Sequence, residues 1–139
     1  MKRIAFLAAG MVALTAIAVP AQAAKPTPKC VPHPVSYEVS GALTAAGSLT
    51  KNSDGSYNGT LTVKVTRTNE NATADKGMTK TYTLTNAHVS FGHGVSKTAP
   101  AAKSRVDLEG TITTEPKTCT AFTPTTTIKK VELLSANKT

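Results

Sequence analysis

The sequence predicts a small all-β domain, and three observations lead to that fold class. The segment Tyr57–Thr68 alternates strictly between apolar residues (Leu61, Val63 and Val65) and polar ones, as a half-buried strand does. Several other segments alternate in the same way, whereas only 96–103 has a composition suited to as much as one helical turn. Glycines at apolar positions and slips in the alternation indicate a sheet that bends enough to close on itself.

The first 23 residues have the anatomy of a secretory signal peptide. Lys2 and Arg3 precede an apolar run over 4–19, and Ala-Gln-Ala at 21–23 is a small-residue cleavage site. The run is short for a bilayer span, which needs roughly 20 residues, so we expect cleavage after Ala23 rather than a retained anchor. No later segment approaches membrane length. The mature protein is therefore expected to be secreted, periplasmic or attached to the cell envelope.

The exported part divides into a proline-rich lead-in (24–34), one domain (35–134) and a short flexible tail (135–139). Alternation predicts five strands in the domain: 35–50, bent at Gly41 and continuing past Gly47, then 57–68, 80–91, 105–114 and 125–134. The turn sequence at 52–55, Asn-Ser-Asp-Gly, joins the first two strands as a hairpin.

Two strands change phase along their length. The apolar parity changes after Leu84 and again between Ile128 and Val131, so we expect a β-bulge near Thr85–Asn86 and a similar irregularity in the last strand. Between the second and third strands, the polar segment Asn69–Gly77 is expected to be a mobile loop.

The motifs V-S-G-A-L (39–43), G-T-L-T-V-K-V (59–65) and S-R-V-D-L-E-G-T-I-T (104–113) resemble OB-like domains of bacterial envelope proteins. Together with the order of three strands, a short link and two strands, the resemblance implies a five-stranded Greek-key barrel. The alternative is an immunoglobulin-like β-sandwich, but that fold has about seven strands and the sequence predicts five.

Cys30 and Cys119 both lie in the exported part, and an even cysteine count in an oxidising compartment indicates one disulfide. A metal site at Cys30 and His33 is the competing interpretation, but four ligands at a recognisable spacing are missing, so we expect no metal and no other cofactor. OB-like topology places strand 105–114 antiparallel beside the first strand. If the cysteines mark the register, Val39 lies beside Gly110 and Gly41 beside Leu108.

The chain carries a net charge of +8, and removal of Lys2 and Arg3 leaves 14 basic and 8 acidic residues, or about +6. Nucleic-acid binding would need exposed aromatic platforms, yet four of the five aromatic residues of the mature chain have core-facing parity, with Phe122 alone in a loop. Because no dense run of Lys or Arg is present, the scattered charges are interpreted first as conferring solubility. The competing interpretation is that they attract an anionic envelope polymer or an acidic protein through long-range electrostatics. The candidate contact residues are Lys64, Arg67, Lys80, His88, Lys103 and Arg105.

The sequence therefore predicts a non-catalytic, exported binding or interaction domain with a basic surface. An inhibitor-like partner of one extracellular protein, with Asn69–Gly77 as its contact loop, is the alternative. A small hydrolase using His88 or Asp107 is the third hypothesis, but the nucleophile, zinc and phosphate-binding motifs are absent from the sequence.

Overall fold

The computed structural model describes residues 30–115 and 122–136. Its elements in chain order are β1 (His33–Leu43), β2 (Ser48–Lys51), β3 (Tyr57–Thr68), the 3-10 helix η1 (Glu70–Asp75), β4 (Thr79–Phe91), β5 (Arg105–Thr114) and β6 (Thr125–Leu134). The signal peptide, Cys119 and the end of the tail lie outside the described residues.

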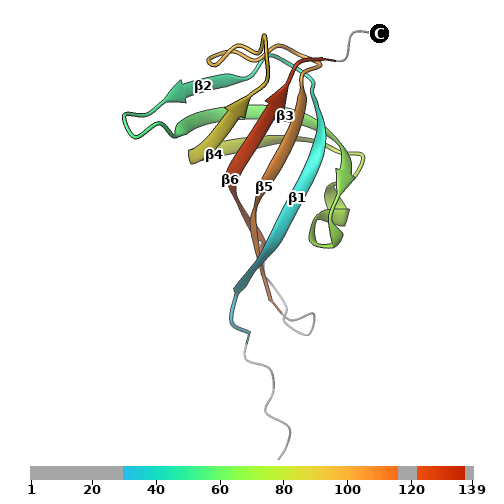
Figure 1. Ribbon diagram of the computed structural model, residues 1–139. Coiled ribbons are helices and arrows are strands. Elements are labelled where there is room, and N and C mark those ends of the chain that lie inside the picture. The colour runs from blue at the N-terminus through green and yellow to red at the C-terminus, as the bar shows by residue number, and fades with distance from the viewer. Residues whose placement is uncertain (1–29, 116–121, 137–139) are drawn as a thin grey trace, which may run out of the picture.

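The strands form one sheet in the order β1-β5-β6-β4-β3-β2, and an additional β1–β3 pairing closes it into a five-stranded barrel with β2 outside. All pairings are antiparallel except β4 with β6, which run parallel. In Figure 1 the lower halves of β1, β5 and β6 extend together beyond the part of the sheet that β3 and β4 contribute. This closed mixed barrel is consistent with the predicted OB-like layout and differs from a sandwich of two packed sheets.

The barrel closes where β1 bends. The register of β1 against β3 shifts between Ser40 and Gly41, and a Cβ on Gly41 would lie 2.0 Å from the carbonyl oxygen of Lys64. Only glycine permits that approach, so the expected kink at Gly41 is confirmed. Gly110 plays the same part between β5 and β6, with a Cβ position 2.0 Å from the Thr127 carbonyl oxygen.

Both expected phase changes are confirmed as bulges. Tyr57 pairs with Ala87 but Gly59 pairs with Leu84, so β4 carries an extra residue at the Thr85–Asn86 step. In the same way, Glu109 and Gly110 of β5 pair with Lys130 and Ile128 of β6, so Lys129 is the extra residue of a bulge in β6. The bulges turn both apolar sets of each strand inward, as the burial of Leu84, Ala87, Ile128 and Val131 shows.

Four expectations need correction. The first predicted strand is two strands, because the chain turns at 44–47, and β2 lies outside the barrel. The expected mobile loop at 69–77 contains η1, which anchors itself through buried Ala72. The segment 96–103 forms no helical turn; buried Pro100 packs there against Gly47, and the segment makes backbone hydrogen bonds to Gly47 and Leu49. These bonds give the sheet edge at β2 a partner without a helix.

The fourth correction concerns register. His33 pairs with Thr114 and Ala42 with Arg105, so paired residue numbers in β1 and β5 sum to 147 rather than the expected 149. Val39 therefore lies beside Leu108, and Gly110 beside Tyr37. Strand β1 also begins two residues before the expected domain boundary and includes Pro34, which lies at its open edge, where a missing N–H costs the sheet nothing. Because Cys119 lies outside the described residues, the disulfide stays a prediction.

Candidate functional site

The barrel interior is filled by side chains. Tyr37, Leu61, Val63, Val65 and Val131 are completely buried, and they belong to one continuous apolar cluster. A ligand of this domain must therefore contact its outer surface. The described residues that carry charge on that surface concentrate on β5 and β6, which hold three each. The outer face of β3 and β4 is mainly threonine, paired as Thr60 with Thr83 and Thr62 with Thr81.

A groove runs along the outer face of β1. It consists of two hollows of about 400 and 220 Å³ that share Ser40, Arg67 and Asp107 in their linings. We call it the β1 groove. Its larger hollow, the acid end, is lined by Glu38, Glu109 and Glu132, and its smaller hollow, the base end, by Arg105, while Asp107 and Arg67 line both.

Strand register places these side chains. On β1, the outward residues are Glu38, Ser40 and Ala42, since Tyr37, Val39 and Leu43 point into the core. Ser40 pairs with Arg67 on one side and Asp107 on the other, and Ala42 has Lys64 and Arg105 as its neighbours. Small side chains on β1 thus leave room between the long charged ones of β3 and β5.

Most charges in the groove lack a partner. Within the described part of the chain, Arg67, Arg105, Asp107 and Glu132 make no hydrogen bond or ion pair through their side chains. Glu109 has a long ion pair with Lys130 at 3.4 Å, with both side chains about half exposed. Such an exposed pair contributes little to stability, so the groove keeps its charges available to a ligand.

The structure brings together part of the predicted contact set. Arg67 and Arg105 meet at the base end, and Lys103 adjoins it through a backbone hydrogen bond to Leu43. Lys64 starts beside Ala42, but its amine donates to the carbonyl of Gly77, away from the groove. Lys80 is committed to an ion pair with Asp75, and His88 lies on β4 beside Lys130 of β6, away from the base end.

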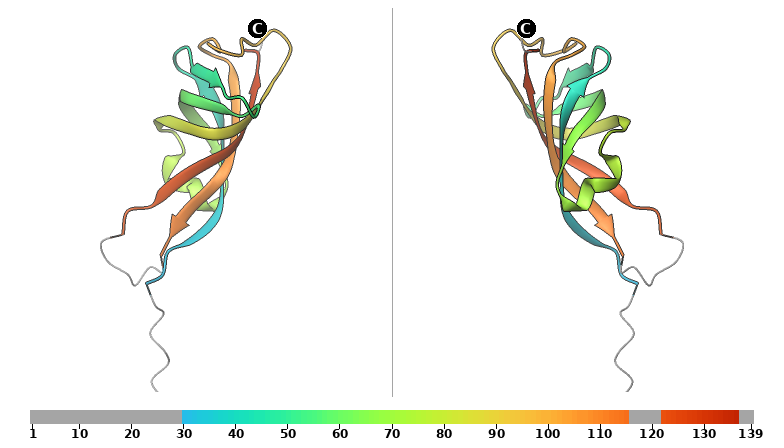
Figure 2. Two further views of the ribbon diagram at one scale, coloured as in Figure 1. Left: turned by 90° about the vertical axis from the view of Figure 1, so that its left-hand side faces the viewer. Right: turned by 90° about the vertical axis from the view of Figure 1, so that its right-hand side faces the viewer.

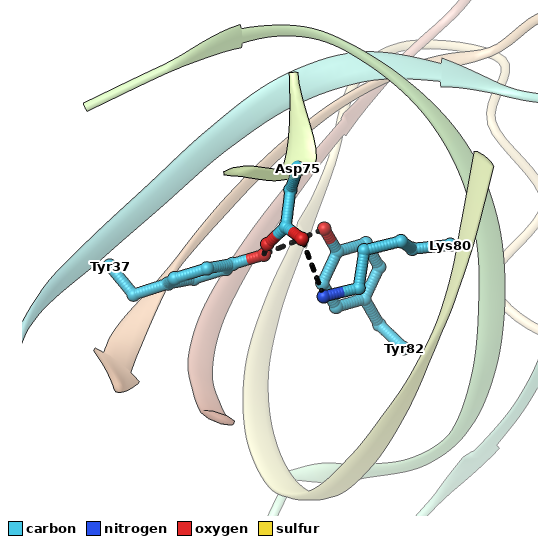
Figure 3. A network of polar contacts seen from close by, with 4 residues as sticks. All are labelled: Tyr37, Asp75, Lys80 and Tyr82. Atoms are coloured by element: carbon cyan, nitrogen blue, oxygen red, sulfur yellow. Dashed lines mark hydrogen bonds and ion pairs between the residues drawn. The ribbon is translucent and has the colours of Figure 1, made fainter. Parts of the chain in front are cut away.

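The segment η1 is tied to the barrel by a second polar cluster (Figure 3). The Tyr37 hydroxyl donates to Asp75 Oδ2 at 2.6 Å and lies 2.8 Å from the Tyr82 hydroxyl, while Lys80 Nζ donates to Asp75 Oδ1 at 2.9 Å. A phenol has one proton, and that of Tyr37 goes to the carboxylate, so Tyr82 is the donor to Tyr37. The Lys80 amine also lies 5.6 Å from the centre of the Tyr82 ring.

Burial raises the pKa of both tyrosines in this cluster. For Tyr37, the hydrogen bond to the Asp75 carboxylate raises the pKa further, because ionisation would break that bond and place two negative charges together. For Tyr82, the largest cause is again burial, and the charge of Asp75 acts in the same direction. The cluster thus holds two neutral phenols that fasten η1 to β1 and β4, with no free nucleophile or base in it.

Sequence reasoning missed the acid end and the η1 cluster. Strand alternation puts Asp107 and Glu109 on the same face of one strand, but Glu38 and Glu132 join them only through cross-strand pairing. It also places Tyr37 and Tyr82 in the core, but the partner Asp75 comes from a segment expected to be mobile. The signal that could have found Asp75 is the need of a buried phenol for a hydrogen-bond partner.

The described residues include no group of three His, Cys, Asp or Glu side chains arranged to hold a metal ion. Among the same residues, no helix has the length and hydropathy to cross a bilayer. Comparison with known proteins found no family model, no curated protein and no solved structure that matches this chain.

Proposed function

We propose that this chain is an exported, non-catalytic interaction domain with an OB-like barrel, which acts at the cell envelope or outside the cell. The observation that carries the proposal is the base end of the β1 groove, where Arg67 and Arg105 have no side-chain partner among the described residues and lie around the small residues of β1. Guanidinium groups bind carboxylates and phosphates through paired hydrogen bonds, so this end suits an anionic group.

The location of the groove supports binding over catalysis. Asp107, the carboxylate of the hydrolase hypothesis, lies on the outer face of the barrel, on the same strand as the exposed ion pair of Glu109 with Lys130. Acid–base catalysis is most effective where water is excluded and a pKa is tuned to its task. An outer sheet face offers neither an enclosed volume nor a buried base, whereas it readily offers contacts to a large partner.

The net charge of about +6 expected of the mature chain favours an anionic partner at long range, and an acidic protein or an anionic envelope polymer meets that condition. The inhibitor-like alternative would use 69–77 for its contact. Figure 2 shows η1 packed beside the barrel. The exposed residues Asn71, Thr73 and Lys76 of segment 69–77 would be the contacts of such an inhibitor. Because Asn69 of this segment also lines the β1 groove, the two surfaces adjoin.

The experiment is co-sedimentation of the purified mature protein with an envelope fraction of the producing cells, at low and at high salt, with poly-glutamate as a defined second probe. We expect salt-sensitive binding that falls at least about tenfold in the double variant R67A/R105A, because each charged hydrogen-bonded contact contributes about 1.5–3 kcal/mol. The matched control is K51A/K97A, which removes two exposed lysines elsewhere. Equal binding by the two double variants would refute the proposal.

A further inference from the structure

The acid end of the β1 groove violates a basic rule of sheet stability. Glu38 lies directly opposite Glu109 on β5, and Asp107 lies directly opposite Glu132 on β6. Like charges directly across an antiparallel pair destabilise a sheet. Four of the eight acidic residues of the chain are thus gathered on one face, in two repelling pairs, although the chain is basic overall.

Within the described part of the chain, Arg67 also lines this hollow but makes no ion pair with its carboxylates. Lys130 reaches Glu109 only at 3.4 Å, and the Ser36 hydroxyl donates to Glu38 at 3.0 Å. Asn69 also lines the acid end, and its Oδ1 is shielded from solvent with no hydrogen-bond partner among the described residues. The acid end therefore has more hydrogen-bond acceptors than donors that engage them within the described part of the chain.

Because the two hollows share Ser40, Arg67 and Asp107, one ligand can occupy both. A uniform polyanion would meet Arg105 at the base end but would be repelled by the carboxylates of the acid end. A uniform polycation would bind the carboxylates of the acid end but would be repelled by Arg105 at the base end. Only a ligand with both signs of charge, in the right order, satisfies the whole groove.

We propose that the β1 groove binds an extended peptide segment of mixed charge, with an acidic side chain at Arg67 and Arg105 and a Lys or Arg side chain at the acid end. This inference rests on the proposed function and specifies its partner as a protein. From Arg105 to Glu109 the strand advances four residues, about 13 Å at 3.3 Å per residue. An extended peptide therefore presents its opposite charges about four residues apart, which a polypeptide does with ordinary side chains.

The test uses short capped peptides and titration calorimetry with the mature protein. The main probe carries a glutamate pair and a lysine pair separated by about three neutral residues. Peptides of the same length with only glutamate or only lysine are the comparisons. We expect the mixed peptide to bind at least about tenfold more tightly than either of the others, with an affinity that falls as salt is raised.

The decisive variant is E109Q/E132Q, with E70Q, in the exposed first turn of η1, as the control for a carboxylate outside the groove. If the groove takes a mixed-charge segment, E109Q/E132Q weakens binding of the mixed peptide and of the envelope fraction, although it relieves repulsion and raises the melting temperature. A change that only disturbed the fold would lower that temperature, so the two readouts together separate lost contacts from lost structure.

An opposite change in binding overturns the inference. If the all-glutamate peptide binds best, or if E109Q/E132Q strengthens binding to the envelope fraction, the acid end merely repels an anionic ligand, and the proposed function survives with a purely anionic partner. If R67A/R105A leaves envelope binding unchanged, the proposed function fails with it.

Discussion

A single hydrogen-bonded residue, Tyr37, connects three parts of the molecule. Its ring is completely buried in the core, and its hydroxyl links Asp75 of η1 to Tyr82 of β4. Burying such a hydroxyl is tolerable only because both of its hydrogen-bonding roles are filled. The residue therefore contributes both apolar packing and the correct placement of η1, which in turn places Asn69 beside the β1 groove.

The raised pKa of Tyr37 predicts a loss of stability in alkali. The folded state holds the phenol proton more tightly than the unfolded state does, so the stabilisation is complete below the ordinary pKa of 10.0 and is lost as the pH rises above it. Y37F should lower the free energy of unfolding at pH 7 by about 1–3 kcal/mol, because Asp75 and Tyr82 each lose a partner, and should make its decline above pH 10 less steep. Urea unfolding from pH 7 to 11 measures both effects.

The control is Y57F, since Tyr57 packs edge-on against Phe91 and its hydroxyl is not in the cluster. An alkaline decline in Y37F as steep as in the wild type and in Y57F would show that the Tyr37 phenol is not the group responsible.

At the scale of the element, η1 shows how a polar sequence becomes ordered. The segment 69–77 has no apolar periodicity, yet Ala72 is buried, the Asn69 N–H donates to Glu38 O, and the amides of Asn69 and Asn71 donate to Ser36 O. These bonds also satisfy carbonyls of β1 on the side where β5 does not pair with it. The order of η1 therefore comes from tertiary contacts, which local propensity does not report.

Two alanines in η1 provide a matched test of this docking. A72D would bury an unpaired carboxylate and should lower the free energy of unfolding by more than about 3 kcal/mol, whereas A74D, two residues away and exposed, should change it by less than about 0.5 kcal/mol. Thermal and urea unfolding give the values. Similar effects of the two substitutions would mean that η1 is not docked in solution.

At the scale of the whole molecule, closure of the barrel depends on one seam. β1 pairs with β5 from His33 to Ala42 and with β3 only from Val39 to Leu43, and η1 bonds to Ser36 and Glu38 on that second side. The first residues of β1 therefore have a strand partner on one side only. A bond between Cys30, just before β1, and Cys119, after β5, would hold that end in place. The pairing of His33 with Thr114 supports this prediction, because it brings the start of β1 to the end of β5.

The double variant C30S/C119S tests the disulfide. In the chain-entropy model, closing a loop of roughly 90 residues stabilises the folded state by about 4–5 kcal/mol, so the variant should lose most of that amount. Mass spectrometry of the exported wild-type protein, with and without reductant, should show a mass lower by two hydrogens before reduction. Two alkylatable thiols in the non-reduced protein would contradict the prediction.

The sequence alone predicts the strands, apart from the separation of β1 from β2, together with their buried faces and both bulges, because the two-residue period of apolar side chains reports burial directly. It does not determine register: a shift of two residues, such as that between the expected pairing of Val39 with Gly110 and the observed pairing with Leu108, leaves every side chain on the same face. Register is a tertiary property: Gly41 of β1 lies against the Lys64 carbonyl of β3 and Gly110 of β5 against the Thr127 carbonyl of β6, so the alignment of β1 with β5 must fit both close approaches at once. The same register sets Glu38 against Glu109 and Arg67 near Arg105. The candidate groove is therefore a property of the tertiary structure, since its residues are distant in sequence and share no local pattern.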